Sequence, residues 1–128
     1  MPTVRTDPFV VISHVAAVQL CTDENFTGCD KSGAGFDTAG NRYDLTNVGV
    51  RMSSADGYSR NNKLTFTGQI TPPSDITLDR VVFSVTKTVD TTTITITTVD
   101  IGDIGQSLTA NTTYQIVVEV TLQAPSSF

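Results

Sequence analysis

Residues 80–99 have the sequence RVVFSVTKTVDTTTITITTV, and this stretch decides the fold class. From Arg80 to Val89 the side chains alternate, so that Val81, Phe83 and Val85 fall on one face of an extended chain. The following run, Thr91 to Val99, is built almost entirely from threonine and isoleucine. β-Branched side chains lose rotamer freedom in a helix and fit a pleated surface. The stretch therefore predicts β-structure.

The same pattern recurs along the chain, which contains 22 threonines among 128 residues. It predicts strands at Tyr43 to Ser53, Lys63 to Ile70 and Tyr114 to Leu122. We expect a long loop with one edge strand between residues 22 and 40, and no convincing helix. The prediction is a single all-β domain over residues 1–128, made of an antiparallel meander with an N-terminal hairpin. The hairpin spans about residues 8–20 and the central sheet about 43–99, and the C-terminal segment, 100–128, is β rather than helical.

Composition and charge exclude several classes of protein. The net charge is −5, which argues against affinity of the whole surface for nucleic acid or anionic membrane but leaves room for one local patch. No apolar run approaches the length of a membrane helix, and the N-terminus lacks the pattern of a secretory signal. We therefore expect a soluble, cytoplasmic protein with no membrane partner.

Two cysteines, Cys21 and Cys29, lie close together in the sequence. Their spacing allows a small disulfide loop. A structural zinc site is excluded, because the sequence offers no second pair of cysteines or histidines to complete the four ligands. Because cytoplasmic thiols are kept reduced, two free thiols are the favoured alternative.

Residues suited to catalysis are sparse. The single histidine, His14, lies in an apolar segment, and the carboxylates are scattered among turns without the spacing of a calcium loop. We predict a protein that is not an enzyme and has no catalytic residues, no metal, no cofactor and no small-molecule substrate.

One face of the predicted meander differs from the rest of the surface. If segments 43–53, 63–70 and 80–88 pair, the apolar face collects Val48, Val50, Met52, Leu64, Phe66, Phe83 and Val85. The opposite face collects Asn47, Gly49, Arg51, Ser53, Lys63, Thr65, Thr67, Gln69, Ser84 and Thr86, with two cations and no acid. This face is either the solvated surface of a β-sandwich or a platform that binds the phosphates of a polyanion through Arg51 and Lys63.

The segment Val50-Arg51-Met52-Ser53-Ser54-Ala55, followed by Asn61-Asn62-Lys63 and a strand ending near Pro72-Pro73, resembles the centre of single-stranded RNA bacteriophage coat proteins. The resemblance implies a homodimer that builds an icosahedral shell, a virion assembled in the bacterial cytoplasm, and a sheet that contacts viral RNA. It implicates Asn47, Arg51, Ser53, Lys63, Thr65 and Thr67 in RNA binding, and the shared face adds Ser84 and Thr86. The uncharged segment 91–98 would be covered by a partner strand.

A second resemblance concerns residues 108–118, LTANTTYQIVV, which are similar to the tyrosine corner of fibronectin type III and other immunoglobulin-like sandwiches. The resemblance implies that the hydroxyl of Tyr114 bonds to the chain a few residues upstream. It also implies an alternative function, that of a capsid decoration or tail protein, or of an adhesion or glycan-binding module. In the adhesion module, Tyr43 and Tyr58 would be the exposed aromatic residues.

Overall fold

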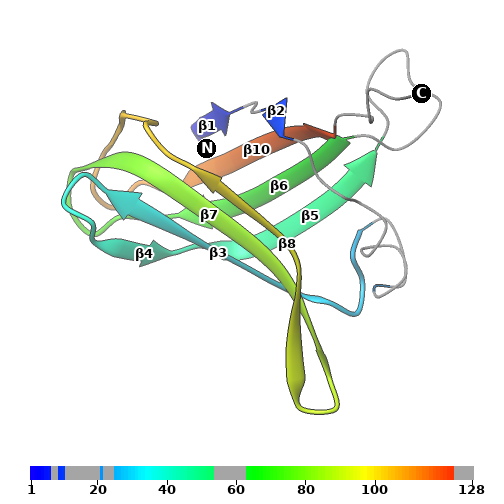
Figure 1. Ribbon diagram of the computed structural model, residues 1–128. Helices are drawn as coiled ribbons and strands as arrows, with labels where there is room; N and C mark the ends of the chain where they lie inside the picture. Colours follow the sequence, from blue (N-terminus) through cyan, green and yellow to red (C-terminus); the bar gives the residue numbers. More distant parts are fainter. Residues whose placement is uncertain (7–8, 11–20, 22–24, 54–62, 123–128) are drawn as a thin grey trace.

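The protein is a sandwich of two β-sheets (Figure 1). The computed structural model describes residues 1–6, 9–10, 21, 25–53 and 63–122, and this part of the chain contains ten strands and no helix. The all-β prediction is confirmed, as is the β character of the described C-terminal segment. No helix in the described ranges is long and apolar enough to cross a membrane.

Sheet A is centred on two long strands, β10 (Tyr114–Leu122) and β6 (Lys63–Ile70), which pair antiparallel. On the far side of β6 lies β5 (Thr46–Ser53), which forms one edge of the sheet. On the far side of β10, two short strands, β1 (Thr3–Thr6) and β2 (Phe9–Val10), pair with it in parallel.

Sheet B is centred on β7 (Ile76–Val89), the longest strand. Strand β3 (Asp30–Asp37) pairs with one side of β7 and is followed by the short edge strand β4 (Arg42–Asp44). The other side of β7 pairs with β8 (Thr92–Ile101) and with β9 (Gln106–Leu108).

The predicted meander is wrong in one pairing: segment 80–88 does not lie beside segment 63–70. Strand β6 pairs with β5 and β10, whereas β7 belongs to the other sheet. Pro72 and Pro73 separate the two strands, and a proline cannot donate to a β-ladder, so the chain leaves sheet A there. Each strand has one apolar face, and facing sheets bury both of these faces against one another.

The core lies between the sheets. Phe66 of β6 and Phe83 of β7 are almost fully buried, and their ring centroids lie 5.5 Å apart. All the residues expected on the apolar face are buried except Val48, which is half-buried. The sequence therefore predicted correctly which side chains point inward, although it assigned them to one sheet instead of two.

Segment 30–37 was expected to be loop or an edge strand, but it forms β3, an interior strand between β4 and β7. Its inward positions include Gly33 and Gly35, which leave room for large neighbours. A Cβ at Gly33 would lie 2.9 Å from Cδ1 of Leu45, and one at Gly35 would lie 2.9 Å from Cδ1 of Leu78. The strand lacked an apolar pattern because side chains from other strands fill its share of the core.

The predicted N-terminal hairpin lies largely outside the described residues, because residues 11–20 are among those not described. The first segment of that hairpin, Phe9–Val10, pairs in parallel with the end of β10.

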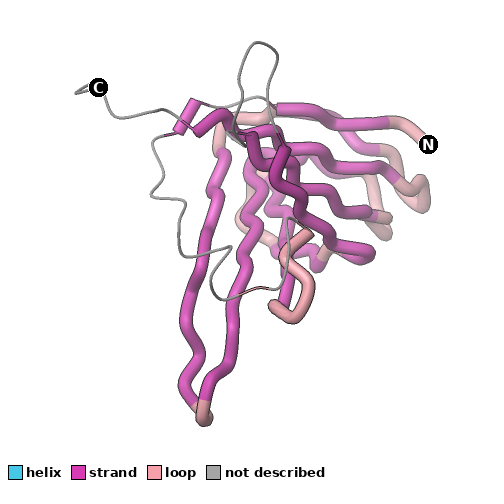
Figure 2. The backbone as a smooth tube through the Cα atoms, turned by 90° about the vertical axis from the view of Figure 1, so that its right-hand side faces the viewer, coloured by secondary structure: helices cyan, strands magenta, loops and turns pink. Residues whose placement is uncertain are grey.

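The β7–β8 hairpin extends beyond the rest of the sandwich (Figures 1 and 2). Strand β3 follows β7 only as far as Thr86, where it pairs through Asp30. Beyond that point the register continues between β7 and β8 alone, from Lys87 opposite Ile94 to Val89 opposite Thr92. We call residues 87–94 the hairpin arm.

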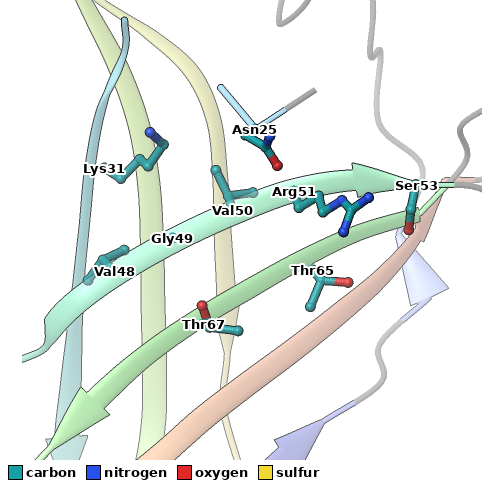
Figure 3. A pocket seen from close by; sticks show the side chains of 9 residues that line it. All are labelled: Asn25, Lys31, Val48, Gly49, Val50, Arg51, Ser53, Thr65 and Thr67. Carbon is teal, nitrogen blue, oxygen red and sulfur yellow. The ribbon is translucent and has the colours of Figure 1, made fainter. Parts of the chain in front are cut away.

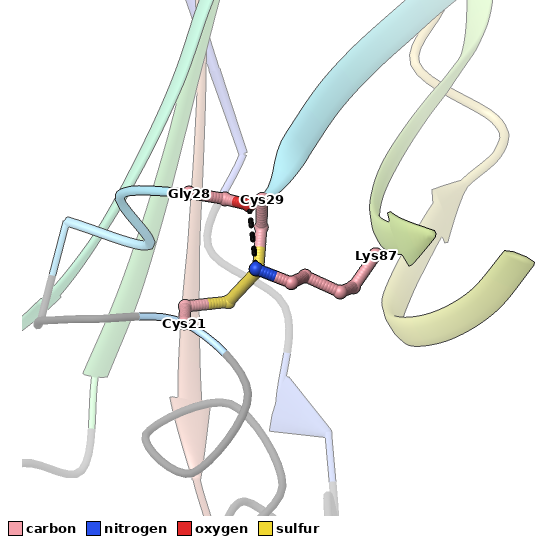
Figure 4. The surroundings of a disulfide bond; sticks show 4 residues. All are labelled: Cys21, Gly28, Cys29 and Lys87. Atoms are coloured by element: carbon pink, nitrogen blue, oxygen red, sulfur yellow. Dashed lines mark hydrogen bonds between the residues drawn. A yellow bond between two sulfur atoms is a disulfide. The ribbon is translucent and has the colours of Figure 1, made fainter. Parts of the chain in front are cut away.

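Cys21 and Cys29 form a disulfide, so the expectation of two free thiols is wrong (Figure 4). The described residues before Cys29 form a turn, in which the backbone N–H of Cys29 donates to the carbonyl of Phe26 at 3.2 Å. The side chain of Phe26 is buried in the core, which holds the turn against the sandwich. The two Cα atoms of the disulfide lie 5.7 Å apart, a normal separation for this bond.

Candidate binding groove

A hollow of about 550 Å³ lies along the open edge of β5 (Figure 3). Four of the residues predicted to contact RNA line it: Arg51 and Ser53 from β5, and Thr65 and Thr67 from β6. The same hollow is lined by five further residues: Asn25, Lys31, Val48, Gly49 and Val50. Figure 3 shows Asn25 and Lys31 on one side of β5 and the two threonines on the other. We call this hollow the β5 groove.

The groove exists because β5 has a strand partner on one side only. Its register with β6 is irregular between Thr46 and Gly49, and Asn47 has a positive φ of 50°. A bulge of this kind twists an edge strand away from regular pairing. Asn47 itself does not line the groove, and its amide Nδ2 donates to Oε1 of Gln69 at 2.9 Å.

Lys63 was expected to bind phosphate, but in the structure its charge is paired. Its Nζ lies 3.0 Å from Oε2 of Glu119, with 30% and 22% of the two side chains exposed. Glu119 belongs to β10, which the sequence did not place beside β6. The expectation that this face carries no acidic residue is therefore wrong, because the neighbouring strand β10 supplies the carboxylate of Glu119.

Ser84 and Thr86 were expected on the same face as Arg51, but they lie on the other sheet. Both belong to β7, and the hydroxyl of Ser84 lies 3.4 Å from that of Thr98 on β8. Their side chains alternate with the buried Phe83 and Val85, so they point to the outer surface of sheet B. The structure thus divides the eight predicted residues between two opposite surfaces.

Two cationic side chains without a partner in the described chain, Lys31 and Arg51, are among the residues that line the groove. Lys31 and Arg51 make no hydrogen bond or ion pair with another described residue. Four other lysine and arginine side chains have partners: Arg42 with Asp44, Lys63 with Glu119, Arg80 with Asp100, and Lys87 with the carbonyl of Gly28. None of the described residues that line the groove is acidic. The described lining of the groove therefore carries two cations and no carboxylate, in a protein of net charge −5.

The chemistry of the lining suits binding of an anion with an apolar part. Val48 is half-buried and Val50 buried, so the wall is partly apolar, while Arg51 is exposed. Ser53, Thr65 and Thr67 add hydroxyls that can donate or accept hydrogen bonds. The described lining has no histidine, cysteine or carboxylate that could serve as a general base. His14 lies outside the described residues.

A second hollow, of about 540 Å³, carries two carboxylates, those of Asp37 and Asp75. Both are already bound by the chain: Oδ1 of Asp75 accepts from the N–H of Ala110 at 2.8 Å, and Asp37 accepts four hydrogen bonds. Among the described residues, no group of three or more His, Cys, Asp or Glu could hold a metal ion. The two carboxylates of the second hollow are therefore explained by the hydrogen bonds that they accept within the chain.

Asp37 closes the turn between β3 and β4 and carries a perturbed pKa. Burial acts to raise this pKa, but the hydrogen bonds from Asn41, Tyr43 and Ala39 outweigh burial and hold it below its ordinary value. The hydroxyl of Tyr43 donates to Oδ2 at 3.0 Å, and this bond, together with burial, raises the pKa of Tyr43. Tyr43 is thus engaged in the fold and is not the exposed aromatic expected of an adhesion module. Tyr58, the other candidate, lies outside the described residues.

The hydroxyl of Tyr114 accepts a hydrogen bond from the backbone N–H of Thr109 at 2.8 Å. This is the bond implied by the resemblance to immunoglobulin-like sandwiches, in which a tyrosine near the start of a core strand anchors the preceding corner. Tyr114 is the first residue of β10.

Two members of the site, Asn25 and Lys31, were not predicted from the sequence. Lys31 lies near the start of β3, a segment without apolar alternation, and Asn25 lies in the loop before it. Nothing local marks either residue. They reach β5 only because the two sheets face each other.

No protein-family model, curated protein or solved structure matches the chain.

Proposed function

We propose that the protein is a non-enzymatic structural module of a virus particle, of the immunoglobulin-like decoration or tail type. It acts by binding copies of itself and neighbouring components. The observation that carries this proposal is the hydrogen bond from Thr109 to the hydroxyl of Tyr114 within a two-sheet sandwich. Such a corner is a recurrent feature of immunoglobulin-like sandwiches. The resemblance to RNA phage coat proteins, which have a single-sheet meander, does not imply such a bond.

The arrangement around β10 departs from the common immunoglobulin pattern. There, the strand that carries the corner is followed by another strand of the same sheet. Here the position beside β10 is taken by β1 and β2, which pair with it in parallel. The N-terminal segment thus satisfies the backbone donors and acceptors on that side of β10.

The disulfide supports a protein that works outside a reducing cytoplasm. Disulfides persist in secreted proteins, in the periplasm and on virion or cell surfaces. A virion protein made in the bacterial cytoplasm could form the bond after the particle is released. The Cys21–Cys29 bond closes a small loop at the base of the hairpin arm, where Lys87 donates to the carbonyl of Gly28 at 3.1 Å (Figure 4).

The RNA phage coat protein is the second candidate function. One observation favours it: Arg51, Ser53, Thr65 and Thr67, four of the residues expected at the RNA, line a single groove. Arg51 and Lys31 could contact phosphates there. Sequence-independent binding to a polyanion strengthens with the number of phosphates neutralised, and two cations are few for a shell that packages a genome.

Light scattering coupled to size-exclusion chromatography separates the two candidates when absorbance is recorded at 260 and 280 nm. A decoration or tail module is expected to elute as one to a few copies without nucleic acid. A megadalton particle that carries nucleic acid would overturn the proposal and establish the coat protein.

A further inference from the structure

The hairpin arm exposes apolar side chains at a protruding site. Every residue from Thr88 to Thr95 is exposed. Val89 is 42% and Ile94 38% exposed, and the one other large hydrophobic residue exposed among those described is Met1 at the chain terminus. Lys87 pairs with Ile94, and Val89 lies two positions beyond Lys87, so Val89 and Ile94 share a face. The arm therefore presents a small apolar surface that nothing in the described chain covers.

An acidic residue lies at the tip of the same arm. Asp90 and Thr91 form the turn, and both have positive φ angles, of 49° and 67°. This left-handed region suits asparagine and glycine at hairpin turns, and a β-branched residue such as Thr91 is strained in it. Asp90 makes no ion pair with another described residue.

The base of the arm is held in place before any partner arrives. Nζ of Lys87 donates to the carbonyl of Gly28 at 3.1 Å, and Gly28 precedes the disulfide-bonded Cys29 (Figure 4). Anchoring of this kind lowers the conformational entropy that is lost when a protruding segment binds.

The arm and the β5 groove are complementary in charge and polarity. Beyond Lys87, whose Nζ is bound to the carbonyl of Gly28 at the base, the arm offers one carboxylate and two apolar side chains. The groove offers two unpaired cations, Lys31 and Arg51, beside Val48. We propose that the hairpin arm of one copy binds along the β5 groove of a second copy, with Asp90 attracted by the cations that line the groove, Lys31 and Arg51. This inference rests on the proposed function, since it supplies the contact by which the structural module self-associates.

Charge reversal tests the contact in the full-length protein. We expect the wild type to self-associate in a sedimentation dilution series, and the association to weaken as salt is added. Asp90→Lys, or Lys31→Glu together with Arg51→Glu, is expected to weaken association by about 100-fold, because each places like charges opposite one another.

Mixing the two reversed variants separates lost charge complementarity from misfolding. Each variant alone brings like charges together, whereas in the mixture every arm meets a groove of opposite charge. We expect the equimolar mixture to recover association close to that of the wild type. Misfolded variants would not recover on mixing.

The exposed ion pair between Arg42 and Asp44 provides matched controls. Both side chains lie on the short edge strand β4, 63% and 79% exposed, and neither lines the groove. Asp44→Lys carries the same charge change as Asp90→Lys, and Arg42→Glu carries half the charge change of the double groove variant. Both control variants are expected to associate as the wild type does.

Three results would overturn the inference: a wild type that stays monomeric at all concentrations, reversed variants that associate normally, or a mixture that fails to recover. Binding of an RNA oligonucleotide, lost in the groove variant while the wild type stays monomeric, would assign the groove to nucleic acid instead. Failure of the arm contact is distinguishable from failure of the proposed function, which would appear as a particle filled with nucleic acid.

Discussion

Replacing Gly33 with alanine tests the packing of the sandwich. A Cβ at this position would lie 2.9 Å from Cδ1 of Leu45 and 3.0 Å from Cδ1 of Phe83. Carbon atoms prefer separations of about 3.5–4.0 Å, so neighbours must move by about half an ångström or more. Leu45 can move its Cδ1 atom away by a change in its side-chain torsion. The ring of Phe83, however, is fully buried and packs against Phe66. The added methyl therefore cannot be accommodated by one flexible side chain.

The magnitude follows from two opposing effects. Overpacking of a well-packed core costs about 1–3 kcal/mol, and the lower entropy of the unfolded alanine variant returns about 0.4–1 kcal/mol. We expect Gly33→Ala to lower the free energy of unfolding by about 1–2 kcal/mol, which corresponds to about 3–10 °C in melting temperature.

Gly102→Ala is the matched control. A Cβ there meets nothing within 4 Å, and its φ lies outside the positive range that would strain an alanine. We expect this variant to be as stable as the wild type or more stable by about 0.5 kcal/mol. Both variants are compared by circular dichroism during urea and thermal unfolding. Equal stability of Gly33→Ala and Gly102→Ala would refute the described packing of β3 against Leu45 and Phe83.

Four further variants or conditions test other features. Tyr114→Phe removes the acceptor of the corner hydrogen bond and should cost about 1 kcal/mol in urea unfolding, and an unchanged midpoint would argue against the corner. The double variant Cys21→Ser, Cys29→Ser should lose about 2–3 kcal/mol, and mass spectrometry after alkylation in denaturant should find no free thiol in the unreduced wild type. The pKa of Asp37 is lower in the folded state, so its carboxylate stabilises the fold above about pH 4 and that contribution is lost as pH falls through the folded-state pKa. Asp37→Asn should therefore melt below the wild type at neutral pH, with the gap closing in acid; a gap independent of pH would contradict this account. The buried Oγ1 of Thr97 has no partner in the described chain, so Thr97→Val should gain about 1 kcal/mol, and a loss in chemical unfolding would indicate a partner.

The strands that could be predicted are those whose own sequence alternates. Segments 63–70 and 114–122 were predicted with the bounds that the structure has, because side-chain alternation with a period of two is a local property of the chain. The tyrosine corner was also local, since Thr109 and Tyr114 are close in sequence. Strand β3 was missed because glycines at its inward positions erase that alternation.

The candidate site was predictable only in part, for the same reason. Arg51, Ser53, Thr65 and Thr67 come from the neighbouring strands β5 and β6, whose pairing was expected. Lys31 joins them from the other sheet. Glu119 neutralises Lys63 because β10 pairs with β6 across a long separation in sequence.

The sequence by itself determined the all-β class, most of the strands and the side chains that point into the core. The tertiary structure decided which strands share a sheet, that β7 faces β6 instead of pairing with it, and that Lys31 and Arg51 line one groove. Alternation specifies that a strand has an apolar face, but any apolar surface can cover that face. The choice among possible covers depends on how all the strands pack together, which no single segment encodes.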